Sequence, residues 1–103
     1  REMNERGVEV LVDAAMRGVR QVYGTLEDGR GGRCAIGVML EALFGTAAWG
    51  THTTDEFNEA YGTTSDEIDK IVTMNNKERL DFIGIARKLG VSPEGKEDSI
   101  SSS

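Results

Sequence analysis

Residues 34–44 read CAIGVMLEALF, and Glu41 is the only charged residue among them. A helix that is apolar on nearly every side must be covered by other parts of the chain, so this stretch predicts a central, buried helix. Gly45 follows it directly, and glycine commonly ends helices because it adopts left-handed backbone angles without strain. We therefore expect the other elements to pack around residues 34–44.

Four other stretches have patterns typical of helices that could cover the central one. They span residues 7–22, 54–61, 65–74 and 77–89. The first repeats apolar side chains at steps of three and four, which is the spacing of an amphipathic helix. Two capping-box pairs, Thr53 with Glu56 and Thr64 with Glu67, mark the starts of the second and the third.

The sequence thus predicts an all-α fold, a compact bundle of about five helices. A length of 103 residues is typical of one domain, which we place over residues 1–91. Residues 24–33, GTLEDGRGGR, hold four glycines and join the first two helices as a flexible turn or a short β-hairpin. Residues 92–103, SPEGKEDSISSS, are rich in serine and charge, and we expect them to form a disordered acidic tail.

The chain has one cysteine and one histidine, which excludes an internal disulfide and argues against a structural zinc site. We expect no metal and no cofactor. No apolar run approaches the ~20 residues of a membrane span, and no signal-peptide pattern opens the sequence. The expected location is therefore the cytoplasm, away from membranes.

The net charge is −6, and residues 41–81 account for it with nine acidic residues against three basic ones. Nucleic-acid binders normally carry a surplus of lysine and arginine, so this balance argues against a nucleic-acid partner. An acidic middle is typical of a solvated helical face. It also fits a surface for a basic protein partner. Homodimerisation stays open, because a chain of this length buries a modest core.

The residues that we expect to bind a protein partner are Trp49, Glu56, Glu59 and Tyr61. Aromatic anchors beside a polar rim are typical of protein interfaces. The alternative for Trp49 and Tyr61 is ordinary packing in the core.

A candidate anion-binding loop comprises Arg30, Gly31, Gly32 and Arg33. Two arginines flank the glycines, and the amides at the start of the next helix point toward the loop. A P-loop is excluded, because Gly29 is followed by arginine rather than by lysine and then serine or threonine. The alternative is a plain flexible connection.

Cys34 and His52 are the candidate catalytic residues. A thiol and an imidazole can act as nucleophile and base, and Asp55 could orient the imidazole. The alternative is a buried, inert Cys34, because free cysteine is among the most buried residue types, and a surface His52. Taken together, the residues favour a protein that is not an enzyme.

Residues 82–92, FIGIARKLGVS, resemble the first helix and turn of a helix-turn-helix motif. The whole motif would span residues 82–100, and its second helix, which would begin at Pro93, reads bases in the major groove. It would contain Glu94, Glu97 and Asp98, and three carboxylates would repel DNA. A nucleic-acid-associated regulator is therefore an alternative function.

Two separate stretches carry a recognisable pattern. Residues 11–38 contain Gln-x-x-Gly-x-Leu followed by Cys-x-Ile-Gly-Val, made by Gln21, Gly24, Leu26, Cys34, Ile36, Gly37 and Val38. Residues 71–86 contain an Asn turn and a Phe-x-x-Ile-Ala helix, made by Asn75, Asn76, Phe82, Ile85 and Ala86. Together they resemble a family of small uncharacterised proteins from bacteriophages and bacterial mobile elements. That family often has paired cysteines and an Asn-Asp turn, which this sequence lacks. The resemblance implies a mobile-element origin and no particular activity.

The same residues also suggest structural roles that need no family. Gly37 should let another helix approach closely, and Gln21 and Asn75 could bind backbone groups of the loops. The favoured function is a small, non-catalytic accessory protein that acts by protein–protein contact through an acidic surface. The alternatives are the nucleic-acid-associated regulator and a small Cys/His enzyme.

Overall fold

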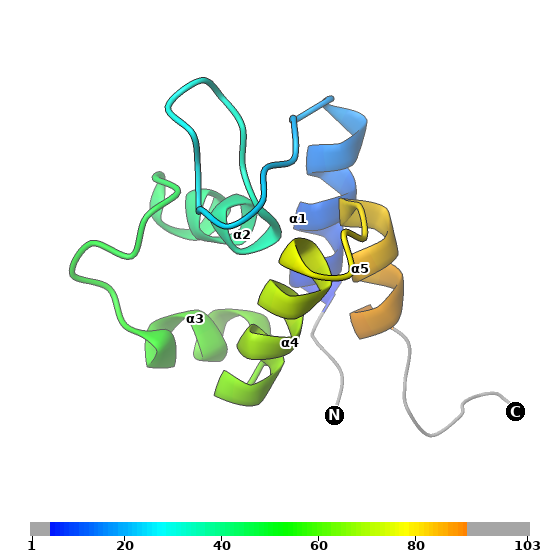
Figure 1. Cartoon of the computed structure of the whole chain (residues 1–103). Helices are drawn as coiled ribbons and strands as arrows, with labels where there is room; N and C mark the ends of the chain where they lie inside the picture. Colours follow the sequence, from blue (N-terminus) through cyan, green and yellow to red (C-terminus); the bar gives the residue numbers. More distant parts are fainter. Residues whose placement is uncertain (1–4, 91–103) are drawn as a thin grey trace, which may run out of the picture.

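Five helices make up the described part of the chain, residues 5–90, in the computed structural model (Figure 1). They are α1 (Glu5–Met16), α2 (Ala35–Phe44), α3 (Thr54–Tyr61), α4 (Ser65–Asn76) and α5 (Phe82–Gly90). The predicted all-α bundle is confirmed. The predicted tail, residues 92–103, lies outside the described residues.

Helix α2 occupies the centre of the bundle, as its apolar sequence predicts. Every residue from Ala35 to Leu40 is buried. Helices α1, α3 and α4 all contact α2, and α1 also lies along α5 (Figure 1). The two helices are in close contact at Gly90, the last residue of α5. A Cβ on Gly90 would lie 2.9 Å from Val8 Cγ2 of α1.

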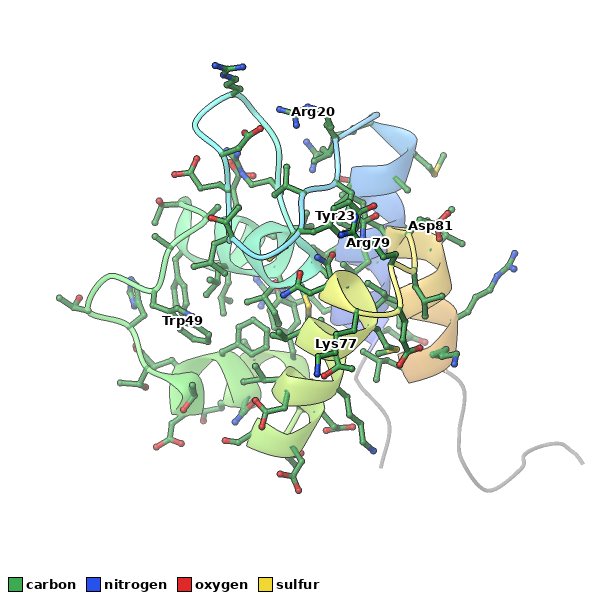
Figure 2. All side chains as sticks on the ribbon, in the orientation of Figure 1. Arg20, Tyr23, Trp49, Lys77, Arg79 and Asp81 are labelled. Carbon is green, nitrogen blue, oxygen red and sulfur yellow. The ribbon has the colours of Figure 1, made fainter. Side chains whose placement is uncertain are left out.

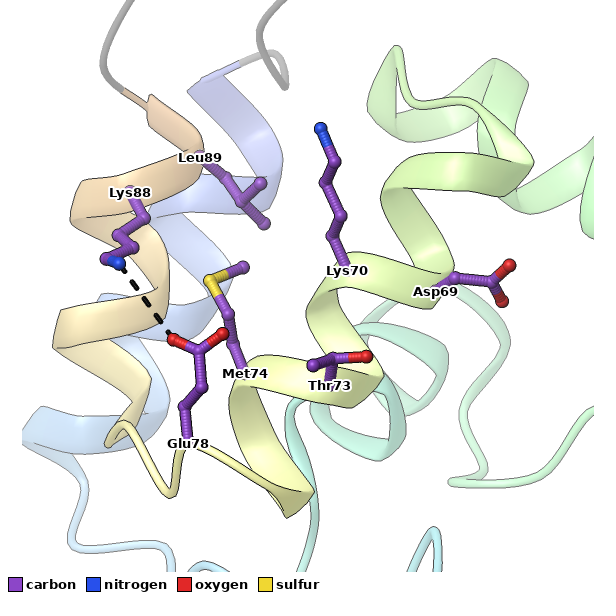
Figure 3. A pocket seen from close by; sticks show the side chains of 7 residues that line it. All are labelled: Asp69, Lys70, Thr73, Met74, Glu78, Lys88 and Leu89. Carbon is purple, nitrogen blue, oxygen red and sulfur yellow. Dashed lines mark ion pairs between the residues drawn. The ribbon is translucent and has the colours of Figure 1, made fainter.

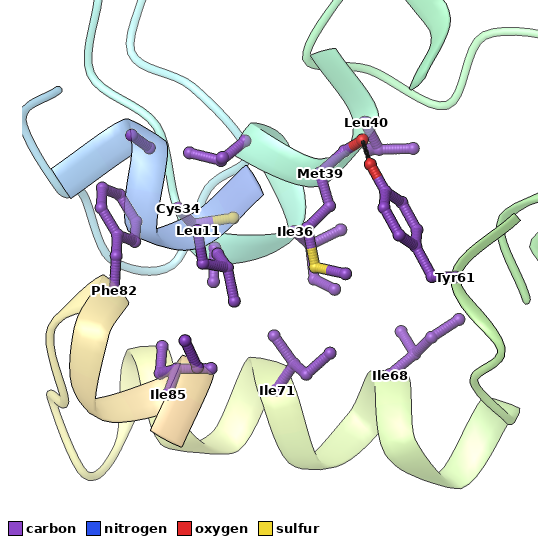
Figure 4. Close-up of a cluster of buried hydrophobic side chains, with 14 of the residues drawn as sticks. Leu11, Cys34, Ile36, Met39, Leu40, Tyr61, Ile68, Ile71, Phe82 and Ile85 are labelled. Carbon is purple, nitrogen blue, oxygen red and sulfur yellow. Dashed lines mark hydrogen bonds between the residues drawn. The ribbon is translucent and has the colours of Figure 1, made fainter. Parts of the chain in front are cut away.

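The core draws side chains from all five helices (Figure 4). Leu11, Met39, Tyr61, Ile71 and Ile85 are each fully buried. Burying one large apolar side chain contributes about 1.5–3 kcal/mol, so these residues supply much of the driving force for folding. The hydrophobic contacts between helices therefore determine where the exposed side chains of each helix lie.

Local capping signals set the starts of α2, α3 and α4. Thr53 and Glu56 form the predicted capping box at α3, and Thr64 and Glu67 form the second at α4. At α2 the capping residue is Cys34, whose Sγ accepts a hydrogen bond from the Gly37 amide at 3.3 Å.

Helix α1 ends at Met16, six residues earlier than the pattern of residues 7–22 predicts. Gly18 adopts a left-handed φ of 76°, and the amides of Gly18 and Val19 donate to the carbonyls of Ala15 and Ala14. This arrangement is a Schellman motif, which terminates a helix.

Helix α5 begins at Phe82 rather than at residue 77. Arg79 has a left-handed φ of 56°, which interrupts any helix through it. Asp81 then caps the new helix, because its Oδ1 accepts from the Gly84 amide at 2.7 Å.

Of the two forms that its sequence allows, the glycine-rich segment takes the turn and not the β-hairpin. Within residues 5–90 it contributes only two isolated bridges, Gln21 to Arg33 and Glu27 to Arg33. The reason is that Asp28 Oδ1 accepts from the amides of Arg30 and Gly32, at 2.8 and 2.9 Å. These hydrogen bonds fold the loop around one carboxylate, and the two amides are then not available to pair with a neighbouring strand.

Gly37 permits a close approach, but by a loop rather than by a helix. A Cβ at this position would lie 2.2 Å from the backbone oxygen of Leu26. The glycine-rich loop therefore rests directly on α2. Among residues 5–90, none of the helices is both long and apolar enough to cross a membrane.

Candidate functional site

The acidic face of the molecule comprises the exposed carboxylates of α3 and of the first two turns of α4. Its members are Asp55, Glu56, Glu59, Asp66 and Asp69. No lysine or arginine occurs in residues 49–69. Apart from Glu56, these carboxylates make no ion pair with any residue in the described range. The face therefore presents uncompensated negative charge.

Glu56 differs from its neighbours because it also forms part of the capping box at the start of α3. Its Oε1 accepts from the Thr53 amide at 2.8 Å and lies 3.5 Å from His52 Nδ1. The hydrogen bond from Thr53, followed by the nearby His52, keeps the pKa of Glu56 below its usual value. Asp55 and Glu59 carry no such structural duty, so they are the better residues for testing the face.

The two aromatic residues predicted to bind a partner have different positions. Trp49 is half-buried, and its ring centroid lies 5.6 Å from that of Phe57. Tyr61 is fully buried, and its hydroxyl donates to the Met39 carbonyl at 2.6 Å. The prediction that Tyr61 contacts a partner is wrong, because its side chain is buried between α3 and α2. Trp49 lies on the loop between α2 and α3, with its ring against Phe57 of α3 (Figure 2).

The candidate anion-binding loop is occupied by the chain's own carboxylates. Asp28 accepts from the amides of Arg30 and Gly32 and from the guanidinium of Arg20. The hydrogen bond from Arg20 is the largest cause that lowers the pKa of Asp28 to about 2. Arg33 donates to both carboxylate oxygens of Glu41, at 3.2 and 3.1 Å. An external anion would have to displace these groups.

Cys34 and His52 are not brought together. Cys34 lies at the start of α2, and His52 stacks on Phe44 at its other end, with ring centroids 3.7 Å apart. Ten helical residues span about 15 Å, which is beyond the reach of proton transfer. Burial raises the pKa of the Cys34 thiol, which disfavours the nucleophilic thiolate. His52 faces Glu56, not Asp55.

Two further observations concern a metal site and the proposed helix-turn-helix. Among the described residues, no three His, Cys, Asp or Glu side chains cluster in a way that could hold a metal ion. The first helix of the proposed helix-turn-helix exists as α5, and its predicted second helix lies outside the described residues.

The two stretches with the recognisable pattern meet in space. Asn75 Oδ1 accepts from Gln21 Nε2 at 2.8 Å and from the Ala35 amide at 3.1 Å. Asn75 Nδ2 donates to the Val22 carbonyl at 2.9 Å. Asn76 Oδ1 accepts from the Gly24 amide at 2.9 Å. Gln21 and Asn75 thus bind loop backbone, as we expect from their residue types.

Beside this network lies a small pocket of about 180 Å³, which we call the loop pocket. It is lined by residues 24–26 of the loop, by Cys34 and Ile36 of α2, and by Val72, Asn75 and Asn76 of α4. Sequence reasoning missed it because its walls come from three distant segments. The one signal was Val72, an apolar residue that cannot share the buried side of α4 with Ile71.

A second hollow is a groove of about 480 Å³ between α4 and the end of α5 (Figure 3). Its lining comprises Asp69, Lys70, Thr73, Met74, Glu78, Lys88 and Leu89. Met74 and Leu89 supply apolar surface, and Lys88 lies 3.9 Å from Glu78 across one end. Charges of both signs surround the groove, so it favours no particular charge in a ligand.

A mixed aromatic and cationic surface lies where the loop meets the α4–α5 turn (Figure 2). Tyr23 is 40% exposed, and the Arg79 guanidinium stands 4.3 Å above its ring centroid. Lys77 and Arg79 form no ion pair within residues 5–90. No sequence pattern pointed to this surface, because Tyr23 and Arg79 lie far apart in the sequence and meet only in the folded chain.

Comparison with known proteins gives no relative: no family model, no curated protein and no solved structure matches the chain.

Proposed function

We propose that this chain is a small, non-catalytic accessory protein of the cytoplasm, borne by a phage or mobile element, that binds a basic protein partner through its acidic face. The observation that carries the proposal is the uncompensated charge of that face. Asp55, Glu59, Asp66 and Asp69 are exposed and make no ion pair within the described range.

The charge pattern suits recognition of a cationic protein. Carboxylates gathered on one side create a local negative potential, which speeds encounter with a positive surface and disfavours other partners. Trp49 lies half-buried against Phe57 of α3, the helix that carries Asp55, Glu56 and Glu59. Tryptophan is among the residue types that most often anchor protein interfaces. Trp49 would therefore supply an apolar contact beside the charges.

The positions of the candidate catalytic residues support a role other than catalysis. A cysteine nucleophile needs a base within hydrogen-bond reach, and Cys34 and His52 sit at opposite ends of α2. Burial raises the pKa of the thiol, so little thiolate is present at neutral pH.

The test is a pull-down from bacterial lysate with the full tagged chain, followed by mass spectrometry and staining for nucleic acid. The variant Asp55→Lys/Glu59→Lys reverses two free charges of the acidic face. Its matched control is Glu5→Lys/Glu9→Lys on α1, where two exposed carboxylates have the same spacing. Neither double variant touches the Glu56 capping box, and thermal melts confirm that both remain folded.

We expect a basic protein to be retained by the natural chain and by the α1 control, and lost from the Asp55→Lys/Glu59→Lys variant. Retention should weaken as salt is raised, because exposed charges are screened. Equal retention by both variants contradicts the acidic face as the binding surface. Recovery of nucleic acid in place of protein contradicts the proposal and favours the regulator.

A further inference from the structure

We propose that the loop pocket is a second interaction surface, which takes one Leu- or Phe-sized side chain from an acidic peptide segment of a partner protein. The pocket lies between residues 24–26 and the C-terminal half of α4. Its charge and its occupant differ from those of the acidic face, so the inference does not depend on the proposed function.

The size and lining of the pocket fit one apolar group. Its volume is about 180 Å³, and its walls include Leu26, Ile36 and Val72. An apolar cavity of about 150 Å³ is large enough for a benzene ring. The pocket therefore has room for one side chain of the size of leucine or phenylalanine and is too small for a ligand larger than that.

Exposed apolar residues gather at the pocket. Met16, Tyr23 and Val72 are the three large hydrophobic side chains that stand exposed among the described residues. Val72 lines the pocket, and Tyr23 directly precedes Gly24 of its wall. Single exposed apolar residues need no explanation, but two beside one apolar hollow mark a surface that gains by being covered.

The charge around the pocket selects the partner. Lys77 follows Asn76 of the lining, and Arg79 stacks over Tyr23 at 4.3 Å. Neither cation has an ion-pair partner within residues 5–90. A carboxylate beside the inserted side chain would pair with them, so the partner segment is acidic.

One polar group at the pocket is free to bind a peptide backbone. Asn76 Oδ1 accepts hydrogen bonds from the backbone amide of Gly24 and from Nδ2 of Asn75. Its Nδ2 donates no hydrogen bond to any described residue. That nitrogen can donate to a carbonyl of the incoming peptide, which distinguishes a peptide from a simple aromatic acid.

The test is an NMR titration of the full ¹⁵N-labelled chain with N-acetyl-Asp-Phe amide. Three probes serve as controls: N-acetyl-Lys-Phe amide, N-acetyl-Asp-Ala amide and phenylacetate. We expect the first peptide to shift the amides of Gly24, Thr25, Leu26, Val72 and Asn76. The lysine and alanine peptides should bind about fivefold more weakly or worse, because each lacks the charge or the anchor.

The variant Lys77→Glu should weaken binding about fivefold or more. Its control is Lys70→Glu, a change at an exposed lysine of α4 outside the pocket lining, which should leave binding unchanged. Val72→Ser should also weaken binding, and the dispersed spectrum shows that the variant is folded. Absence of shifts at these amides, or shifts confined to other surfaces, overturns the proposal. Binding of the lysine peptide as strong as that of the aspartate peptide overturns the acidic partner. Equal binding of phenylacetate overturns the peptide as occupant.

Discussion

The side-chain nitrogen of Gln21 donates to Oδ1 of Asn75 at 2.8 Å, across 54 residues of sequence. The same nitrogen donates to the Leu80 carbonyl at 2.7 Å. Asn75 is only 1% exposed, and both its oxygen and its nitrogen make two hydrogen bonds. One buried amide thus ties together the loop after α1, the start of α2 and the end of α4.

Replacing Asn75 with alanine should lower the free energy of unfolding by about 3 kcal/mol, because the Ala35 amide and the Val22 carbonyl lose their partner in the interior. Urea denaturation measures the loss. Thr73→Ala, an exposed change on the same helix, is the control and should cost less than about 1 kcal/mol. A loss as small for Asn75→Ala would contradict the role of this network.

Gly37→Ala should be strongly destabilising, by about 3 kcal/mol or more, because its Cβ would lie 2.2 Å from the Leu26 oxygen and the loop would have to move. Gly84→Ala is the matched helical control. Its Cβ would meet Asp81 Oδ1 at 3.1 Å and the Leu80 side chain at 3.5 Å, and both side chains can shift, so the change should cost about 1 kcal/mol or less. Thermal melts of the two variants give the comparison, and similar midpoints would show that the loop does not rest on α2.

Asp28 should make stability depend on pH in the acidic range. Its pKa is lowered from 3.8 to about 2, chiefly by the hydrogen bond from Arg20. A carboxylate with a lowered pKa stabilises the fold above its unfolded value and loses that effect as the pH falls through the folded value. Stability should therefore drop between about pH 4 and pH 2.

The variant Asp28→Asn should flatten that part of the profile, and Arg20→Gln should raise the pKa of Asp28. Carbon-detected NMR of the carboxyl group follows the titration directly. A pKa near 3.8 in the natural chain would mean that the loop does not close around this carboxylate in solution.

Cys34 should be inert toward bulky thiol reagents in the folded protein. It is 7% exposed, and burial raises its pKa, so both access and thiolate content are low. Reaction with an aromatic disulfide reagent should accelerate only as urea unfolds the chain. Rapid reaction of the native protein would revive the cysteine enzyme. A titration in denaturant confirms that the thiol is free.

Much of the helical frame could be predicted because its signals are local. The capping boxes at Thr53 and Thr64 fix the starts of α3 and α4 within a few residues of sequence. The nearly all-apolar stretch of α2 predicts a helix that is covered by the others. The starts and ends that the pattern missed depend on single backbone angles, at Gly18 and Arg79, which apolar periodicity does not encode.

The candidate sites were harder to predict, because they depend on which distant residues meet. Tyr61 has the residue type of a contact residue, but only packing shows that its hydroxyl points at the Met39 carbonyl. The glycine-rich loop looked able to bind an anion, and the structure gives its amides to Asp28, four residues or fewer away. The loop pocket needs three segments at once, so no single stretch announces it.

The central position of α2 has a consequence for how the protein unfolds. The five described helices have between 8 and 12 residues. Isolated helices shorter than about 12–15 residues are marginal in water, so each depends on the others. Removing α1, α3 or α4 uncovers α2, and α5 packs on α1 and α4, so opening one helix alone exposes apolar surface. The amides of α2, with the Ala35 amide held by Asn75, should exchange with solvent deuterium only when the whole bundle opens.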